Sequence, residues 1–119
     1  YDMLHGQDET ILAELALGGA QGGICGTSNY NGRGLVAILD CWAKGDIDGA
    51  RRHQDYAQAV INVICHYRGN IVAGKRIMKL LGFDLGPNRT PFQNMTDEEE
   101  QQMRQELEAI DFFTHANQF

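Results

Sequence analysis

The chain has 119 residues, enough for one domain with a hydrophobic core, and its 43% hydrophobic and 22% charged residues are ordinary for a globular protein. Ten Lys and Arg against sixteen Asp and Glu give a net charge of −6, and no basic cluster offsets it, which argues against a nucleic-acid partner. No apolar run approaches the roughly 18 residues that span a bilayer, so we expect no membrane partner.

Cysteine and histidine usage gives no sign of a metal site. Cys25, Cys41 and Cys65 are odd in number and lack metal-site spacing, so we expect reduced thiols in a cytoplasmic protein. The four histidines lie in separate segments, and none has metal-ligand spacing to a carboxylate. We therefore predict no metal and no other cofactor.

Two segments near the start share the order strand, polar loop, helix. Residues 1–5 are predicted to form a strand that enters a loop at Gly6, and a helix follows to about Leu17, where Gly18 ends it. Residues 20–25 are small and apolar, as in a second strand packed against helices. This repeated order predicts an α/β protein with parallel strands, whose ligands bind at the carboxyl ends of the strands.

The rest of the chain is predicted to be helical, with apolar residues three and four positions apart. Asp46 is expected to cap one helix, and Thr96 with Glu99 is expected to form a capping box. The predicted helices cover residues 35–45, 46–67, 70–81 and 96–110, segments 26–34 and 82–94 are predicted loops, and the tail 114–119 is expected to fray. The expected buried faces of the last two helices are Ala73, Ile77 and Leu80, and Met103, Leu107 and Ile110.

A pair of parallel strands leaves two unpaired edges and does not form a stable sheet alone. Either these strands join a sheet made by residues outside this chain, or the two segments are loops; we favour the first interpretation. The sequence also starts abruptly, inside the predicted first strand, so we expect it to be a piece of a longer protein.

Asp8 and Glu9 are adjacent carboxylates at the start of a predicted helix. They complement the positive helix N-terminus, or they accept hydrogen bonds from the hydroxyls of a sugar-like ligand, which Gly6 would allow to approach closely. Similarly, Gly22–Asn29 is either a phosphate cradle or a tightly packed strand end, and the absence of a nucleotide-binding motif favours packing. Cys25 has no identifiable catalytic partner, and Lys75 is expected on a solvated helix face.

Several motifs spread along the chain resemble the last third to half of N-acetylneuraminate lyases, which belong to the dihydrodipicolinate synthase superfamily of (β/α)₈ barrels. These motifs are Gly6–Glu9, Gly19–Ile24, Thr27–Asn29, Lys44–Asp46, Gly86–Phe92 and Leu107–Phe112. The resemblance implies that residues 1–45 hold the last two βα units of a TIM barrel and that residues 46–119 form a C-terminal helical extension. Since a full barrel has about 250 residues, this chain would be a C-terminal portion.

The same resemblance implies a class I aldolase that splits N-acetylneuraminate into N-acetylmannosamine and pyruvate. The lysine that forms the Schiff base and the tyrosine that moves protons belong to earlier strands of the barrel. This chain would thus hold no catalytic residue and be inactive alone. Its partners would be the sugar acid, the N-terminal part of the barrel and further copies in a tetramer.

By matching position, Gly6, Asp8 and Glu9 would bind the polyol part of the substrate. The family has a serine where this chain has Gly26, and Thr27 would supply the hydroxyl if the register shifts by one residue. This departure leaves open an aldolase for another 2-keto-3-deoxy sugar acid. A different class, a stand-alone helical interaction module in which the two strands are loops, also remains open. We assign Arg89 no chemistry.

Overall fold

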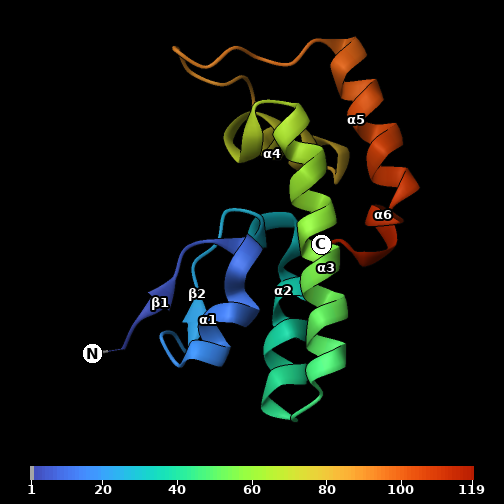
Figure 1. Cartoon of the computed structure of the whole chain (residues 1–119). Coiled ribbons are helices and arrows are strands. Elements are labelled where there is room, and N and C mark those ends of the chain that lie inside the picture. Colours follow the sequence, from blue (N-terminus) through green and yellow to red (C-terminus); the bar gives the residue numbers. More distant parts are fainter. Residues whose placement is uncertain (1) are drawn as a thin grey trace. The chain divides into compact units, whose positions relative to one another are not determined.

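The computed structural model describes residues 2–119 and is mostly helical, with one two-stranded parallel sheet (Figure 1). Residues up to Ala59 together with His115–Phe119 form one compact unit, and Val60–Thr114 form another. In chain order the elements are β1 (Leu4–His5), the 3-10 turn η1 (Asp8–Thr10), α1 (Ile11–Leu17), β2 (Gly22–Gly23), α2 (Ser28–Ala43), α3 (Ile47–His66), α4 (Gly69–Leu80), α5 (Asp97–Ala109) and α6 (Phe112–His115).

The two strands of the first unit pair in parallel, as the sequence predicts. Leu4 faces Gly22 and His5 faces Gly23, and the Ile24 N–H extends the ladder by donating to the His5 carbonyl at 2.9 Å. Both strands are shorter than the predicted ranges 1–5 and 20–25, because each is bonded along one edge and regular pairing covers only the residues that face each other. Tyr1, included in the predicted first strand, lies outside the described residues.

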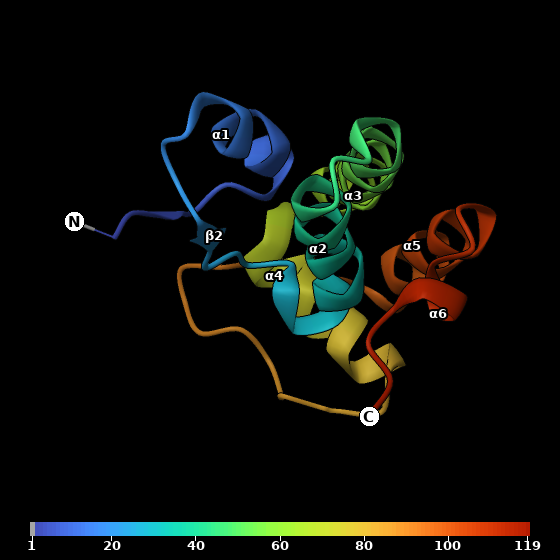
Figure 2. The ribbon, with the colours of Figure 1, turned by 90° about the horizontal axis from the view of Figure 1, so that it is seen from below.

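Helix α1 packs against β2 and against α2 (Figure 2), and the core of the first unit is built by α1, α2, the first part of α3 and Cys25. Gly18 ends α1 in the left-handed conformation, with φ of 71°, and its N–H donates to backbone carbonyls of the last turn, as predicted. At the start of α3 the Asp46 carboxylate accepts the Gly49 N–H at 2.8 Å, which confirms the predicted cap. The core residues are Ile11, Cys25, Leu35, Ile38, Ala50 and Ala57.

The predicted loop over residues 26–34 is wrong, because α2 already begins at Ser28. Glycine, serine and asparagine are poor helix formers, but Tyr30 is only 1% exposed, and burial of its ring outweighs local propensity. The helix is not regular here: Asn31 has non-helical angles, φ −118° and ψ 22°, and kinks the helix.

The prediction that the tail 114–119 frays is also wrong. The side chain of Ala116 is fully buried, and Asn117 makes backbone and side-chain hydrogen bonds to the first turns of α2. These contacts join residues more than eighty positions apart, so no local sequence pattern predicts them.

The second unit is built as predicted, from α4, an irregular segment over 82–94 and α5. Thr96 and Glu99 form the predicted capping box, with Glu99 N–H donating to Thr96 Oγ1 and Thr96 N–H donating to the Glu99 carboxylate. Leu80 and Ile110 are half-buried rather than buried, since they lie at helix ends with fewer neighbours. The fully buried side chains of this unit include Val72, Ala73, Ile77, Met103, Leu107 and Phe112. Among residues 2–119, none of the helices has the length and apolar content needed to cross a membrane.

Candidate functional site

Parallel pairing of β1 and β2 brings the two loops that follow them to the same edge. Asp8, in the loop after β1, and Thr27, just before α2, are 6% and 3% exposed. Asp8 Oδ2 accepts two hydrogen bonds from this one residue, from the Thr27 N–H at 2.8 Å and from the Thr27 hydroxyl. A buried carboxylate is tolerated because these donors replace its hydration. Asp8 therefore ties the two loops together.

Cys25 lies in the same buried region. Burial raises the pKa of its thiol to about 12, with further contributions from the negative charge of Asp8, a hydrogen bond to Asp8 and the charge of Glu9. Since the thiolate is the reactive form of cysteine, this thiol is inert, which agrees with the packing role expected from the sequence. Cys25, Cys41 and Cys65 are all free thiols.

The glycine pair of β2 shows why small residues are needed next to Cys25. A Cβ on Gly23 would lie 3.0 Å from Cys25 Sγ and 3.1 Å from the His5 carbonyl oxygen, so close that these neighbours would have to move. A Cβ on Gly22 would make only an ordinary contact of 3.8 Å with Leu4. Close strand packing is therefore the role of Gly23, in agreement with the interpretation favoured from the sequence.

Gln54, in the first half of α3, holds the segment after β1 through two hydrogen bonds. Its side-chain nitrogen donates to the Asp8 carbonyl at 2.9 Å, and its side-chain oxygen accepts the Leu12 N–H at 3.0 Å. The sequence analysis missed this residue, because a single glutamine on a largely polar helix carries no signal that it faces a loop 46 residues earlier.

The remaining predicted site residues lie at the outer side of the same two loops. Glu9 is half-buried, whereas Gly6 and Gly26 are exposed. A Cβ on Gly6 would have no heavy atom within 4 Å, so the space beside it is open. The hydroxyl of Ser28 donates to the Cys25 carbonyl at 2.6 Å, which orders the second loop from within.

Asp8 has a structural role that the sequence analysis did not consider. No side chain caps the start of η1, so Asp8 acts as a bridge between loops and not as a helix cap. A held carboxylate, a neighbouring accessible carboxylate and open glycine backbone form a surface that can accept hydrogen bonds from hydroxyl groups. Within the described residues no cluster of three or more His, Cys, Asp or Glu side chains is placed to hold a metal ion.

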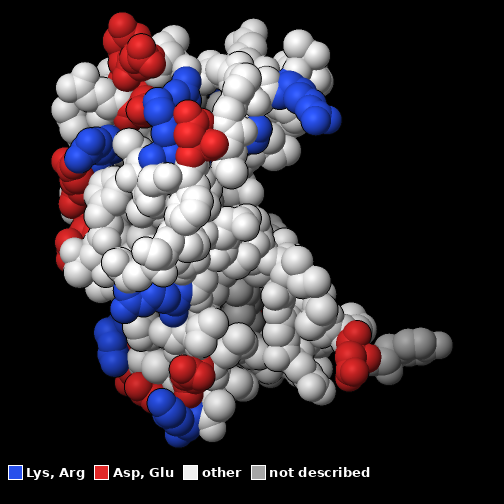
Figure 3. Space-filling model, turned by 180° about the vertical axis from the view of Figure 1, so that it is seen from behind, with Lys and Arg blue, Asp and Glu red and all other residues white. Residues whose placement is uncertain are grey.

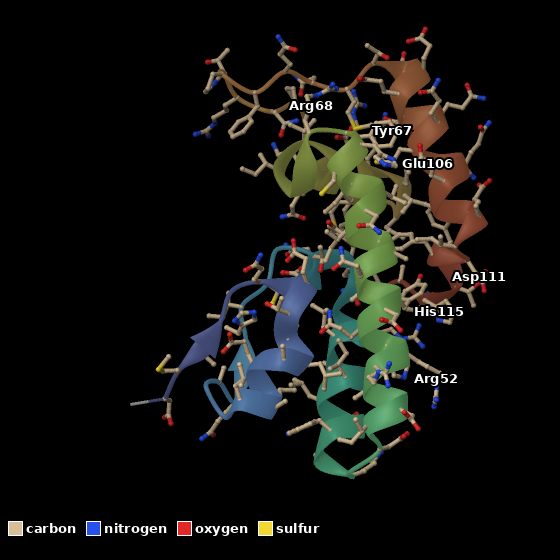
Figure 4. The ribbon with its side chains drawn as sticks, viewed as in Figure 1. Arg52, Tyr67, Arg68, Glu106, Asp111 and His115 are labelled. Carbon is tan, nitrogen blue, oxygen red and sulfur yellow. The ribbon has the colours of Figure 1, made fainter. Side chains whose placement is uncertain are left out.

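Several polar side chains of the second unit pair with one another. Tyr67 donates its hydroxyl hydrogen to Glu106 at 2.5 Å (Figure 4). His66 Nδ1 lies 2.9 Å from the other Glu106 oxygen. Burial and then this hydrogen bond raise the pKa of Tyr67 to about 12, while the same bond lowers the pKa of Glu106. Arg68 makes a two-pronged ion pair with Glu99, at 2.8 and 2.6 Å.

A cavity of about 360 Å³ in the second unit is lined in part by basic side chains, but these have partners of their own. Lys75 donates to the carbonyls of Leu85 and Pro87, and Arg76 pairs with Glu100 at 2.7 Å. On the face shown in Figure 3, basic and acidic residues alternate without a large patch of either sign. We therefore place the candidate site on the loops after β1 and β2.

The chain belongs to the Dihydrodipicolinate synthetase family, whose pattern matches residues 1–110. This confirms the resemblance inferred from the sequence motifs. N-acetylneuraminate lyase from Rhizobium meliloti is 36% identical over 106 residues, covering 89% of this chain and 35% of the relative.

Solved structures agree with this assignment. N-acetylneuraminate lyase from Proteus mirabilis superposes with a TM-score of 0.85 and 33% identity, covering 94% of this chain and 37% of that protein. The 2-keto-3-deoxygluconate aldolase of Sulfolobus, in complex with D-KDPG, superposes with a TM-score of 0.78 and 29% identity, covering 89% and 36%. The chain thus spans about a third of the length of the relatives that it matches.

Proposed function

We propose that this chain is the C-terminal portion of a (β/α)₈ barrel, with residues 1–45 as the last two βα units and residues 46–119 as a helical extension. Two observations support this. The chain covers 35% of its Rhizobium meliloti relative, and its two strands leave both outer edges unpaired among the described residues. Apolar residues along the strand pair are well exposed, with Met3 at 61%, Leu4 at 59% and Ile24 at 75%, as surfaces that neighbouring strands and helices would cover.

For the complete protein we propose a class I aldolase that cleaves N-acetylneuraminate to N-acetylmannosamine and pyruvate through a Schiff base. This chain would supply one wall of the sugar pocket, and the reactive lysine would come from an earlier strand. The observation that carries the proposal is the meeting of the two loops at the carboxyl ends of parallel strands, where barrel enzymes bind their substrates. Assembly as a tetramer in the cytoplasm belongs to the same proposal.

Within the pocket wall, the two carboxylates would orient the hydroxyls of the sugar. Asp8 is held rigid by Thr27, and Glu9 is the more accessible of the pair. Gly6 and Gly26 would let the substrate lie against the backbone. Such contacts lower the reaction barrier by fixing the substrate relative to the imine, without bond chemistry of their own.

The test is a substrate panel on the complete protein, with Glu9→Gln as the variant and Asp48→Asn, an exposed residue, as the matched control. We expect Glu9→Gln to raise KM for the sugar acid about tenfold, the effect of losing a hydrogen bond from a charged group. Borohydride trapping of pyruvate on the enzyme should stay unchanged. Loss of trapping in parallel with loss of turnover would contradict a role confined to sugar binding.

An aldolase for another 2-keto-3-deoxy sugar acid is the second candidate. It is favoured by Gly26, where the sialic-acid enzymes carry a serine, and by the superposition on 2-keto-3-deoxygluconate aldolase. Faster cleavage of 2-keto-3-deoxygluconate than of N-acetylneuraminate would select it. The pairing of the two strands and the family membership count against the stand-alone helical module.

A further inference from the structure

The first turns of α2 contain a kink at Asn31, and Asn117 of the C-terminal tail forms hydrogen bonds around it. At Asn31 the backbone leaves helical geometry, which weakens the regular hydrogen-bond ladder of the helix. Asn117 lies against this kink and makes three hydrogen bonds to its backbone. Its N–H donates to the Tyr30 carbonyl at 2.8 Å, its side-chain nitrogen donates to the Ser28 carbonyl at 2.9 Å, and its side-chain oxygen accepts the Arg33 N–H at 3.1 Å.

The tail is seated tightly at this place. Ala116 is fully buried, and its carbonyl accepts a hydrogen bond from the Arg33 guanidinium at 3.3 Å. A Cβ on Gly32 would lie 3.3 Å from the Asn117 side-chain oxygen, so the helix backbone and the asparagine are in close contact. Through its N–H and its side chain, Asn117 therefore bonds to backbone groups on both sides of the kink.

The turn that Asn117 contacts, the first turn of α2, follows directly after Thr27 of the candidate site. The Thr27 carbonyl accepts the N–H groups of Tyr30 and Asn31, at 3.0 and 2.7 Å. On its other side Thr27 donates its own N–H and hydroxyl to Asp8. An unbroken series of hydrogen bonds therefore runs from Asn117 through the first turn of α2 to the buried carboxylate.

We propose that Asn117 is a positioning residue for the sugar pocket, which keeps the first turn of α2 formed so that Thr27 holds Asp8 in place. The inference rests on the proposed aldolase function of the complete protein. Asn117 does not touch the pocket; it acts through the geometry of Thr27. Without it, the kinked turn loses its external partners and opens locally, and the sugar loses an ordered wall.

The experiment compares Asn117→Ala, Asn117→Asp and the control Gln118→Ala in the complete protein. Gln118 is exposed, and its one described hydrogen bond is to Ala116 in its own tail, so its removal should change nothing. For Asn117→Ala we expect amide hydrogen exchange over residues 27–33 to accelerate at least about tenfold, because the substitution removes two side-chain hydrogen bonds, the one to the Ser28 carbonyl and the one from the Arg33 N–H. Asn117→Asp keeps the acceptor for the Arg33 N–H but loses the donor to Ser28, so its effect should be intermediate.

The kinetic readout separates positioning from general damage. We expect KM for the sugar acid to rise about as much as local exchange, while borohydride trapping of pyruvate stays at the wild-type level. Unchanged exchange over 27–33, equal acceleration along the whole chain, or unchanged KM despite local acceleration would each overturn the inference. A wild-type protein that cleaves no 2-keto sugar acid overturns the proposed function instead, whereas active wild type with an unaffected Asn117→Ala variant overturns the positioning role alone.

Discussion

The two units of the chain hold their loops in different ways. In the first unit, the loops after β1 and β2 are joined by one buried carboxylate whose partner lies 19 residues away. In the second unit, the start of α5 is held by a local capping box and by the half-exposed Arg68–Glu99 ion pair. A buried contact with no water to replace a lost partner is costly to break, whereas an exposed one is weak because solvent competes for both groups.

Removal of the Asp8 carboxylate should have the largest effect. Asp8→Ala leaves the Thr27 N–H and hydroxyl buried without an acceptor, so we expect a loss of about 3 kcal/mol in the free energy of unfolding, with sugar turnover falling as the loops separate. Urea unfolding and steady-state kinetics of the complete protein measure the two effects. If Asp8→Ala were no less stable than Glu9→Gln, the buried bridge would not be the element that joins these loops.

The strand pair offers a second test inside the first unit. Gly23→Ala forces a Cβ against Cys25 Sγ and the His5 carbonyl, and overpacking of this kind costs about 2 kcal/mol. The neighbouring substitution Gly22→Ala is the matched control, because its Cβ has room and should change stability by less than about 0.5 kcal/mol. Equal unfolding midpoints for the two variants would show that β2 shifts to make space.

The features that the sequence predicts correctly depend on residues close together in the chain. The left-handed Gly18, the Asp46 cap and the Thr96–Glu99 box each need only three or four neighbouring residues, and all are present. The parallel pairing of two strands also follows from their order, although their full predicted lengths do not form.

The features that the sequence analysis misses are contacts between segments that are distant along the chain. The start of α2 at Ser28 depends on burial of Tyr30, and the ordered tail depends on Asn117 bonding to residues more than eighty positions away. The candidate site shows the same division. The spacing of the two loops identifies where it lies, but the bridge from Asp8 to Thr27 and the brace from Gln54 are visible only in three dimensions.

In the second unit, removing a helix cap should lower the free energy of unfolding by less than the Asp8 and Gly23 substitutions do in the first unit. Thr96→Ala removes the side-chain acceptor for the Glu99 N–H, and loss of a helix cap costs about 1 kcal/mol. Gln102→Ala, an exposed change further along α5, serves as the control and should be nearly neutral. A Thr96→Ala variant as unstable as Asp8→Ala would contradict the distinction between exposed local caps and buried bridges.

The smallest effect should be the pH dependence of the Arg68–Glu99 pair. Hydrogen bonds from Arg68, and then from the Thr96 backbone, lower the pKa of Glu99 from its ordinary 4.5 to about 2. A lowered pKa in the folded state means that folding favours the charged carboxylate. Its contribution to stability is therefore complete above pH 4.5 and is lost as the pH falls towards 2.

Glu99→Gln isolates this contribution from the other carboxylates of the protein. The difference in unfolding midpoint between wild type and Glu99→Gln should be constant at pH 6 and 5, shrink below pH 4.5, and decrease with added salt, since both side chains are about a third exposed. Gln102→Ala carries no titrating group and should differ from wild type by the same amount at every pH. A Glu99→Gln difference that persists unchanged at pH 3 would mean that the carboxylate acts through neutral hydrogen bonds to the cap rather than through its charge, and the pairing with Arg68 would then not stabilise this helix end.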